Sequence, residues 1–166
     1  MQVIGIGTGG SQIATELAQH EAYDIMVIDT SFKKELNNVE QILIDSQETI
    51  KEYEEKTNLD ISKKVRHNNV HVFLFGGGKT TGATLRILQR IQDKKITVHY
   101  VRPEKNFLSN KQKLRERMTC GILQELARSA VFSKIYLYDA LEVLKEAEVN
   151  FLQKKDYVAS TIAGMF

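Results

Sequence analysis

Two clusters of glycine and threonine are the part of this sequence best suited to chemistry. The first cluster reads Gly5-Ile6-Gly7-Thr8-Gly9-Gly10, and the second reads Gly76-Gly77-Gly78-Lys79-Thr80-Thr81-Gly82. Each cluster follows a short apolar run and precedes an amphipathic stretch. Backbone N–H groups in such a turn, together with the start of the next helix, attract a phosphate group. Two turns of this kind predict a polyphosphate that is held from two sides.

The first cluster also has the spacing of a dinucleotide-binding turn. Gly5, Gly7 and Gly10 satisfy the pattern GxGxxG, and Asp29 ends the next apolar run 19 positions after Gly10. An acidic residue at that place binds a ribose in dinucleotide-binding folds. Two further readings stay open: a tight strand-to-helix turn without a ligand, and a small NAD-binding module. The NAD module leaves the second cluster unexplained and supplies no residue for hydride transfer.

The second cluster is not a Walker loop. Gly78-Lys79-Thr80 matches the end of the pattern GxxxxGKT, but the first glycine of that pattern would fall at Phe73. Three consecutive glycines add chain entropy that folding must remove. We therefore expect Gly76–Gly78 to turn its backbone amides toward an oxyanion.

The elements that must position these clusters alternate along the chain. The apolar runs, which we expect to be strands buried on both faces, are Val3–Ile6, Ile25–Ile28, Val70–Phe75, Ile96–Val101 and Ile135–Tyr138. The expected helices are Ser11–His20, Ser46–Lys56, Thr81–Gln92, Lys111–Ser129, Ala140–Leu152 and Asp156–Phe166. This alternation predicts an α/β fold, with a Rossmann-like, mainly parallel sheet and helices on both faces. Residues 31–69 have the weakest pattern, and no strand is predicted there.

Length and composition narrow the class of protein. The chain has 166 residues and no internal repeat or linker, so we expect a single domain over residues 1–166. The hydrophobic fraction of 42% excludes a largely disordered chain, and a net charge of +2 does not favour a nucleic-acid partner. No stretch has the roughly 20 apolar residues of a membrane span. One cysteine fits a reducing compartment, so we expect a cytoplasmic protein.

Taken together, these residues resemble the nucleotide-binding domain of the tubulin/FtsZ family. Gly76–Gly82 is similar to that family's GGGTGTG signature loop, and Gly7–Gly10 stands at the place of its first glycine-rich loop. Weaker matches follow in the family's order: Val101-Arg102-Pro103, Gly121-Ile122 with Glu125-Leu126, Ile135–Asp139, and Asp156-Tyr157-Val158 with Ile162 and Gly164. The resemblance covers nearly the whole chain.

The resemblance implies a site for GTP or GDP. The implied phosphate contacts are Gly7, Thr8, Gly9 and Gly10 for the α- and β-phosphates, and Gly76, Gly77, Gly78, Thr80, Thr81 and Gly82 for the β- and γ-phosphates. Asp156 would accept hydrogen bonds from the guanine N1–H and exocyclic amine, and Phe151 would stack on the purine. The family's sugar-contacting acidic residue has no clear counterpart here.

Lys79 and Thr80 depart from the family's signature, which has Thr and Gly there. Lys79 would either neutralise phosphate charge that a magnesium ion otherwise screens, or point to solvent. Mg²⁺ therefore stays open as a second cofactor.

The resemblance also implies a limit on activity. The sequence ends about two turns into the family's connecting helix, and the second domain, whose acidic residues activate the attacking water in a neighbouring subunit, has no counterpart. We therefore expect guanine-nucleotide binding with slow or absent hydrolysis, and GTPase activity only if a partner chain supplies those residues. Because family members assemble head to tail, self-association or assembly with other chains is expected. The alternative is a structural or assembly protein that keeps the fold without the nucleotide.

Other reactive residue types form no competing site. The histidines His20, His67, His71 and His99 have no metal-ligand spacing, so we expect no metal site and place them at the surface or at strand edges. Cys120 lies beside Met118 and Ile122 in an expected helix, where a small apolar role is expected.

Overall fold

The computed structural model describes residues 1–145 and 154–166, and its strands form a six-stranded sheet. The strands are β1 (Gln2–Ile6), β2 (Asp24–Asp29), β3 (Val39–Leu43), β4 (Asn69–Phe75), β5 (Lys95–Arg102) and β6 (Lys134–Asp139). Every neighbouring pair is parallel, in the order β3-β2-β1-β4-β5-β6. The predicted α/β, Rossmann-like parallel sheet is therefore confirmed.

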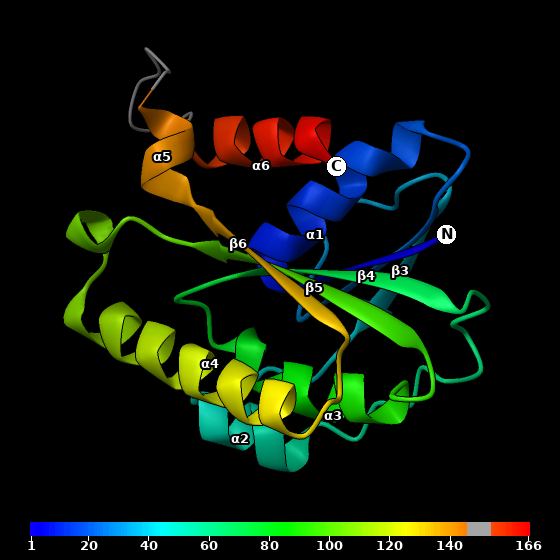
Figure 1. Ribbon diagram of the computed structural model, residues 1–166, viewed down its shortest axis with the longest axis horizontal. Coiled ribbons are helices and arrows are strands. Elements are labelled where there is room, and N and C mark those ends of the chain that lie inside the picture. Colours follow the sequence, from blue (N-terminus) through cyan, green and yellow to red (C-terminus); the bar gives the residue numbers. More distant parts are fainter. Residues whose placement is uncertain (146–153) are drawn as a thin grey trace.

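Helices cover both faces of this sheet. They are α1 (Gly7–Glu16), α2 (Ile50–Lys56), α3 (Ala83–Arg90), α4 (Asn110–Arg128), α5 (Ala140–Leu144) and α6 (Lys154–Met165). Within the described residues, three short 3-10 turns accompany them: η1 (Leu17–Gln19), η2 (Thr80–Gly82) and η3 (Lys105–Phe107). Figure 1 shows α1, α5 and α6 on one side of the sheet and α2, α3 and α4 on the other.

Two clusters of buried side chains hold these layers together. Alternate residues of a strand point to opposite faces, so Val3 packs with Ile13 of α1, whereas Ile4 belongs to the cluster that contains Leu88 of α3. Burying one such side chain stabilises the fold by roughly 1.5–3 kcal/mol. This two-sided burial explains why the central strands read as continuous apolar runs.

The structure differs from the sequence-based expectation in the segment 31–69, where the edge strand β3 was not predicted. Its sequence, Val-Glu-Gln-Ile-Leu, lacks a continuous apolar run because only Ile42 is buried. An edge strand needs less apolar surface than a central one, so its pattern is weak.

Helix boundaries also differ from the prediction. Helix α1 begins at Gly7 rather than Ser11, so the first glycine cluster is itself the first helical turn. Helix α5 is described only as far as Leu144, within the predicted stretch Ala140–Leu152. Phe151 lies outside the described residues.

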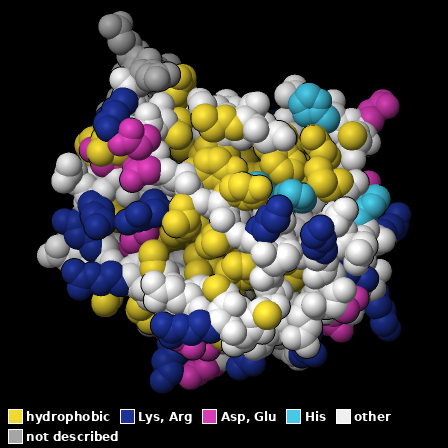
Figure 2. Space-filling model, in the orientation of Figure 1, with side chains coloured by type: hydrophobic (Ala, Val, Ile, Leu, Met, Phe, Trp, Pro, Cys, Tyr) yellow, Lys and Arg dark blue, Asp and Glu magenta, His cyan; other side chains and the backbone are white. Residues whose placement is uncertain are grey.

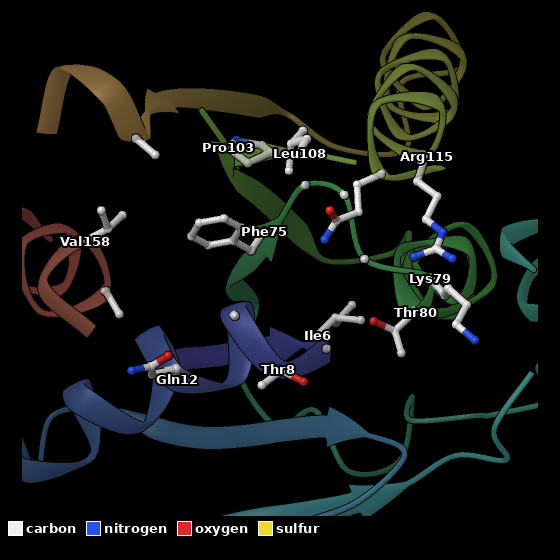
Figure 3. Close-up of a pocket in the computed structure, with 18 of the residues that line it drawn as sticks. Ile6, Thr8, Gln12, Phe75, Lys79, Thr80, Pro103, Leu108, Arg115 and Val158 are labelled. Carbon is white, nitrogen blue, oxygen red and sulfur yellow. The ribbon is translucent and has the colours of Figure 1, made fainter. Parts of the chain in front are cut away.

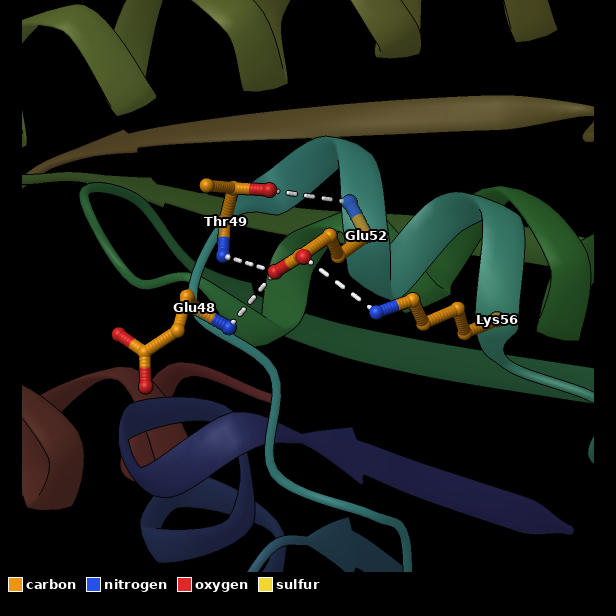
Figure 4. A network of polar contacts seen from close by, with 4 residues as sticks. All are labelled: Glu48, Thr49, Glu52 and Lys56. Atoms are coloured by element: carbon orange, nitrogen blue, oxygen red, sulfur yellow. Dashed lines mark hydrogen bonds and ion pairs between the residues drawn. The ribbon is translucent and has the colours of Figure 1, made fainter.

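Helix α2 begins at Ile50, later than the predicted Ser46, because Thr49 caps it. The Thr49 hydroxyl accepts a hydrogen bond from the N–H of Glu52, and the Glu52 carboxylate accepts one from the N–H of Thr49 (Figure 4). Lys56 Nζ pairs with the same carboxylate at 3.3 Å. This reciprocal arrangement satisfies two N–H groups that the helix itself cannot.

The described residues contain no helix long and apolar enough to traverse a lipid bilayer.

Candidate functional site

The site lies at the carboxyl ends of β1 and β4, where the chain leaves the sheet in opposite directions. After β1 the chain enters α1 on one face, and after β4 it enters η2 and α3 on the other. In open α/β sheets such a switch point forms a crevice in which ligands bind. Here the crevice is a cavity of about 720 Å³ that residues of both glycine clusters line.

The first cluster combines one strained turn with close helix packing. Gly7 has a φ of 70°, a conformation that side chains rarely adopt, at the point where β1 becomes α1. A methyl group on Gly10 would collide with the carbonyl oxygen of Phe73, and one on Gly5 would collide with that of Gly10. These glycines therefore let α1 lie directly against the strands, with its first N–H groups at the cavity.

The second cluster has packing reasons for most of its glycines. Gly77 has a φ of 82°. A methyl group on Gly76 would collide with the Glu116 carboxylate, and one on Gly82 with the carbonyl oxygen of Ile50. A methyl group on Gly77 or Gly78 would meet only ordinary contacts, and of these two only Gly77 has a positive φ. These packing and turn roles are compatible with the expected contact to an oxyanion, which stays a prediction for all three glycines; only at Gly78 does neither packing nor a positive φ offer another reason for glycine.

The two clusters meet across the cavity. A methyl group on Gly7 would collide with the Thr80 hydroxyl, so the turn after β1 touches η2 after β4. The Thr81 hydroxyl donates to the carbonyl of Gly78 at 2.9 Å and lies 2.9 Å from the hydroxyl of Thr119 on α4. The second cluster is therefore anchored to α4.

Basic side chains line the cavity, two of them beside the second cluster and one, Lys154, on α6. Figure 3 shows Arg115 reaching from α4 toward Lys79 and Thr80, and Phe75 pointing across the cavity toward Val158. Lys79 Nζ lies 3.6 Å from the Glu48 carboxylate, so its side chain is directed by an ion pair at the rim. Lys154 Nζ lies 4.3 Å from the centre of the Phe107 ring. Three cations at one cavity favour an anionic ligand.

Asp29 is the acidic group at the other end of the cavity. It is buried, and it accepts hydrogen bonds from the Thr8 hydroxyl at 3.0 Å and from the N–H of Thr30 at 2.8 Å. A carboxylate has about four acceptor sites, so two remain for ligand hydroxyl groups. Glu104 is a second acidic residue of the lining.

Most of the predicted site residues line this cavity. They are Gly7, Thr8, Gly9, Gly76, Gly77, Gly78, Lys79 and Thr80. Gly10, Thr81 and Gly82 lie behind it, where Gly10 packs on Phe73 and Thr81 holds the carbonyl of Gly78.

Asp156 stands outside this lining, exposed on the first turn of α6. Its Oδ1 accepts a hydrogen bond at 2.5 Å from Nε2 of Gln12, and Gln12 does line the cavity. The residue predicted to read the base is therefore one side chain away from the cavity.

Sequence reasoning missed the contribution of α4. Gln112 and Arg115 line the cavity, and Thr119 contacts Thr81. These three positions are spaced i, i+3 and i+7, which places them on one helix face. That spacing is visible in the sequence and could have indicated that this face of α4 borders the site.

His99 and His71 are not the surface or strand-edge histidines that were predicted. His99 is buried on β5, its ring stacks on Phe73 at 4.4 Å, and its Nδ1 lies 2.9 Å from the Tyr138 hydroxyl. His71 Nδ1 lies 2.9 Å from His99 Nε2. Burial, and secondarily the neighbouring His71, lowers the pKa of His99 to about 4, and burial also lowers the pKa of His71.

A second polar group is packed behind Gly76. The Tyr100 hydroxyl donates to the buried Glu116 carboxylate, and Cys120 Sγ lies 3.6 Å from the same carboxylate. Burial, with Glu116 as the next cause, raises the pKa of Tyr100 and of Cys120. Cys120 is therefore held as a neutral thiol, half-buried, rather than as a nucleophile. Within the described ranges, no group of three or more His, Cys, Asp or Glu side chains could hold a metal ion.

Comparison with known proteins defines the class but not a family. No family model and no curated protein matches this chain. Among solved structures, the chain is similar to a short chain dehydrogenase family protein from Francisella tularensis subsp. tularensis, with 14% identity and a TM-score of 0.52, over 99% of this chain and 88% of that chain. At this identity the likeness concerns the fold alone. The chain is an α/β protein of the Rossmann-like class.

Proposed function

We propose that this chain binds a nucleotide whose phosphate groups lie between the two glycine clusters. The observation that carries the proposal is the meeting of both clusters at one cavity, with Lys79 and Arg115 on its wall. The N-terminus of α1 and the turn at Gly78 supply N–H groups, and the two cations offset phosphate charge. Binding, rather than a chemical step, is the activity that these groups support.

A guanine nucleotide is the first candidate ligand. It is supported by the resemblance of Gly76–Gly82 to the tubulin/FtsZ signature. It is also supported by the position of the two glycine clusters, which would contact the phosphates from two sides of the cavity. Asp156 would accept hydrogen bonds from guanine once it releases Gln12, which it now contacts. Slow or absent hydrolysis is part of this candidate.

A dinucleotide such as NAD is the second candidate, and the comparison with solved structures favours it over the first. The sheet order and the GxGxxG turn are those of dinucleotide-binding folds, and the buried Asp29 at the end of β2 has free acceptor sites for ribose hydroxyls. The solved structure with a similar fold is that of a short chain dehydrogenase family protein. If neither ligand binds, the alternative of a structural or assembly protein without a nucleotide is favoured.

Calorimetric titration of the purified chain with GTP, GDP, ATP and NAD tests the proposal. We expect Arg115→Met to weaken whichever ligand binds by roughly tenfold, because one charge-assisted hydrogen bond to phosphate is lost. The matched control is Arg128→Met, at the far end of α4, where the guanidinium pairs with Glu125. Absence of binding by all four ligands would refute the proposal.

Two acidic residues separate the candidates. Guanine recognition predicts that Asp156→Ala weakens GTP and leaves NAD unchanged. Ribose recognition in a dinucleotide predicts that Asp29→Ala abolishes NAD binding. Circular dichroism of each variant is needed because Asp29 also holds Thr8. Repeating the GTP titration with Mg²⁺ and with a chelator shows whether Lys79 and Arg115 replace the metal charge.

A further inference from the structure

The two outer strands of the sheet each leave one edge unpaired. Among the described residues, β3 and β6 are the ends of the sheet, and neither has a strand on its outer side. The N–H and C=O groups of such an edge are a template for another strand, and proteins usually cover or shorten it. Neither edge strand is shortened in this way, because β3 has five residues and β6 has six.

Strand β6 exposes apolar side chains on both of its faces. Ile135 is 37% exposed, Tyr136 48% and Leu137 61%, although strands of parallel sheets are normally covered on both faces. Leu114 and Met118 of α4 and Leu141 of α5 are exposed as well. Figure 2 shows hydrophobic side chains gathered across this face of the molecule, over β6. A contiguous apolar surface of this kind marks a contact with another protein.

The segments beside the two edges carry opposite charge. Residues 109–134, which contain α4 and lead into β6, include six basic and two acidic residues. Residues 39–56, which contain β3 and α2, include six acidic and two basic residues. Helices α2 and α4 lie on the same side of the sheet (Figure 1). The edge at β3 also exposes an apolar side chain, Leu43, at 64%.

We propose that β6 of one copy pairs with β3 of a second copy and continues the parallel sheet. All strands of the sheet run in the same direction, so a second copy placed with its β3 beside β6 keeps both the strand direction and the helix layers. In that arrangement the basic α4 segment faces the acidic α2 segment. The contact is heterologous, so it grows as an open chain of subunits. It does not depend on which nucleotide is bound.

Charge is the reason for choosing β3 of a second copy over β6 of a second copy. Two β6 edges could pair only in antiparallel fashion about a twofold axis, which would place one basic α4 segment against another. Like charges across an interface oppose association. The β3 edge offers the opposite charge, an exposed leucine and an unpaired backbone.

Sedimentation velocity over a range of protein and salt concentrations tests the pairing. We expect the average mass of the wild type to rise continuously with concentration and to fall with salt. Leu137→Lys should block the β6 edge and Leu43→Lys the β3 edge, each weakening self-association by roughly tenfold or more, because a lysine ammonium would be buried at the contact. Met165→Lys, at an exposed position on α6 rather than on an edge strand, is the matched control and should assemble as the wild type does.

Mixing the two edge variants identifies the partner surface. Each variant retains one functional edge, so an equimolar mixture should form a heterodimer that does not grow, although each variant alone stays monomeric. A wild type that remains monomeric throughout would overturn the proposal. So would a Leu43→Lys variant that assembles like the wild type, because β6 would then bind itself or a different protein.

Discussion

Within the two glycine clusters, Gly78 is a glycine that neither close packing nor a positive φ explains. The nearest heavy atom to a methyl group there would be the Thr80 hydroxyl oxygen at 3.8 Å, which is an ordinary contact. At Gly10, in contrast, the methyl group would meet the backbone oxygen of Phe73, which cannot move without displacing β4. Substitutions at these two positions can therefore distinguish the ligand contact proposed for Gly78 from the packing role of Gly10.

At the residue scale, we expect Gly78→Ala to leave the free energy of unfolding within about 0.5 kcal/mol of the wild type. Gly10→Ala should lower it by roughly 1–3 kcal/mol, because α1 is forced away from β4. Chemical denaturation measures both. If the N–H at Gly78 binds phosphate, Gly78→Ala also weakens nucleotide binding, because the added methyl group crowds the phosphate. A large loss of stability in Gly78→Ala would show that its role is structural.

At the scale of elements, the capping box of α2 sets where the chain turns after β3. The N–H of Glu48, and then Lys56, hold the pKa of the Glu52 carboxyl below its usual value, so the box is complete at neutral pH. Helix α2 contacts η2, and the carbonyl of its first residue, Ile50, is the atom against which Gly82 packs. The cap therefore supports the wall of the cavity as well as the helix.

Thr49→Ala is expected to lower the free energy of unfolding by about 1 kcal/mol, the usual value for a lost N-cap. For a domain of this size, that loss lowers the melting temperature by roughly 2–4 °C. Thr57→Ala, at the other end of α2, is the matched control, since the backbone N–H of Thr57 donates to the carbonyl of Tyr53 there and alanine keeps that N–H. Equal melting temperatures for the two variants would contradict the role of the capping box.

At the scale of the whole molecule, an aromatic group joins three strands and the last residue. The rings of Phe73, His99 and Tyr136 stack across β4, β5 and β6, and Phe166 packs edge-on against His99 at 5.2 Å. Because the His99 ring is buried, a proton on it must be desolvated. The histidine therefore couples the stability of the molecule to pH.

The pKa of His99 is lowered from 6.5 to about 4, so the unfolded chain binds a proton more readily than the folded one between these values. The stability that depends on neutral His99 is fully present above pH 6.5 and is lost as the pH falls toward 4, by up to about 3 kcal/mol. Denaturant titrations at a series of pH values measure this slope. His99→Phe should flatten it, whereas the exposed His20→Gln should not.

Much of the fold follows from local patterns. The five predicted strands were confirmed, and so was the helical character of the stretches between them as far as the structure describes those stretches, because burial on both faces leaves continuous apolar runs in β1, β2, β4 and β5. The expectation that Ile135–Tyr138 is buried on both faces was wrong, because β6 is an edge strand whose side chains are largely exposed. Strand β3 was not predicted because it is an edge strand whose polar residues give a sequence pattern similar to that of a loop. The two turns were recognised from their glycines, yet the structure assigns packing roles to Gly5, Gly10, Gly76 and Gly82 that composition does not reveal.

The sequence by itself determined the α/β class, the two glycine turns and the acidic residue at the end of β2, because these depend on residues close together in the chain. Only the tertiary structure decided that the two turns touch between Gly7 and Thr80 and that Arg115 lines the same cavity. It also decided that His99 is buried and that the side chains of β6 are exposed. Each of these depends on the order of strands in the sheet. That order results from contacts between residues far apart in sequence, whose free energies no local pattern records.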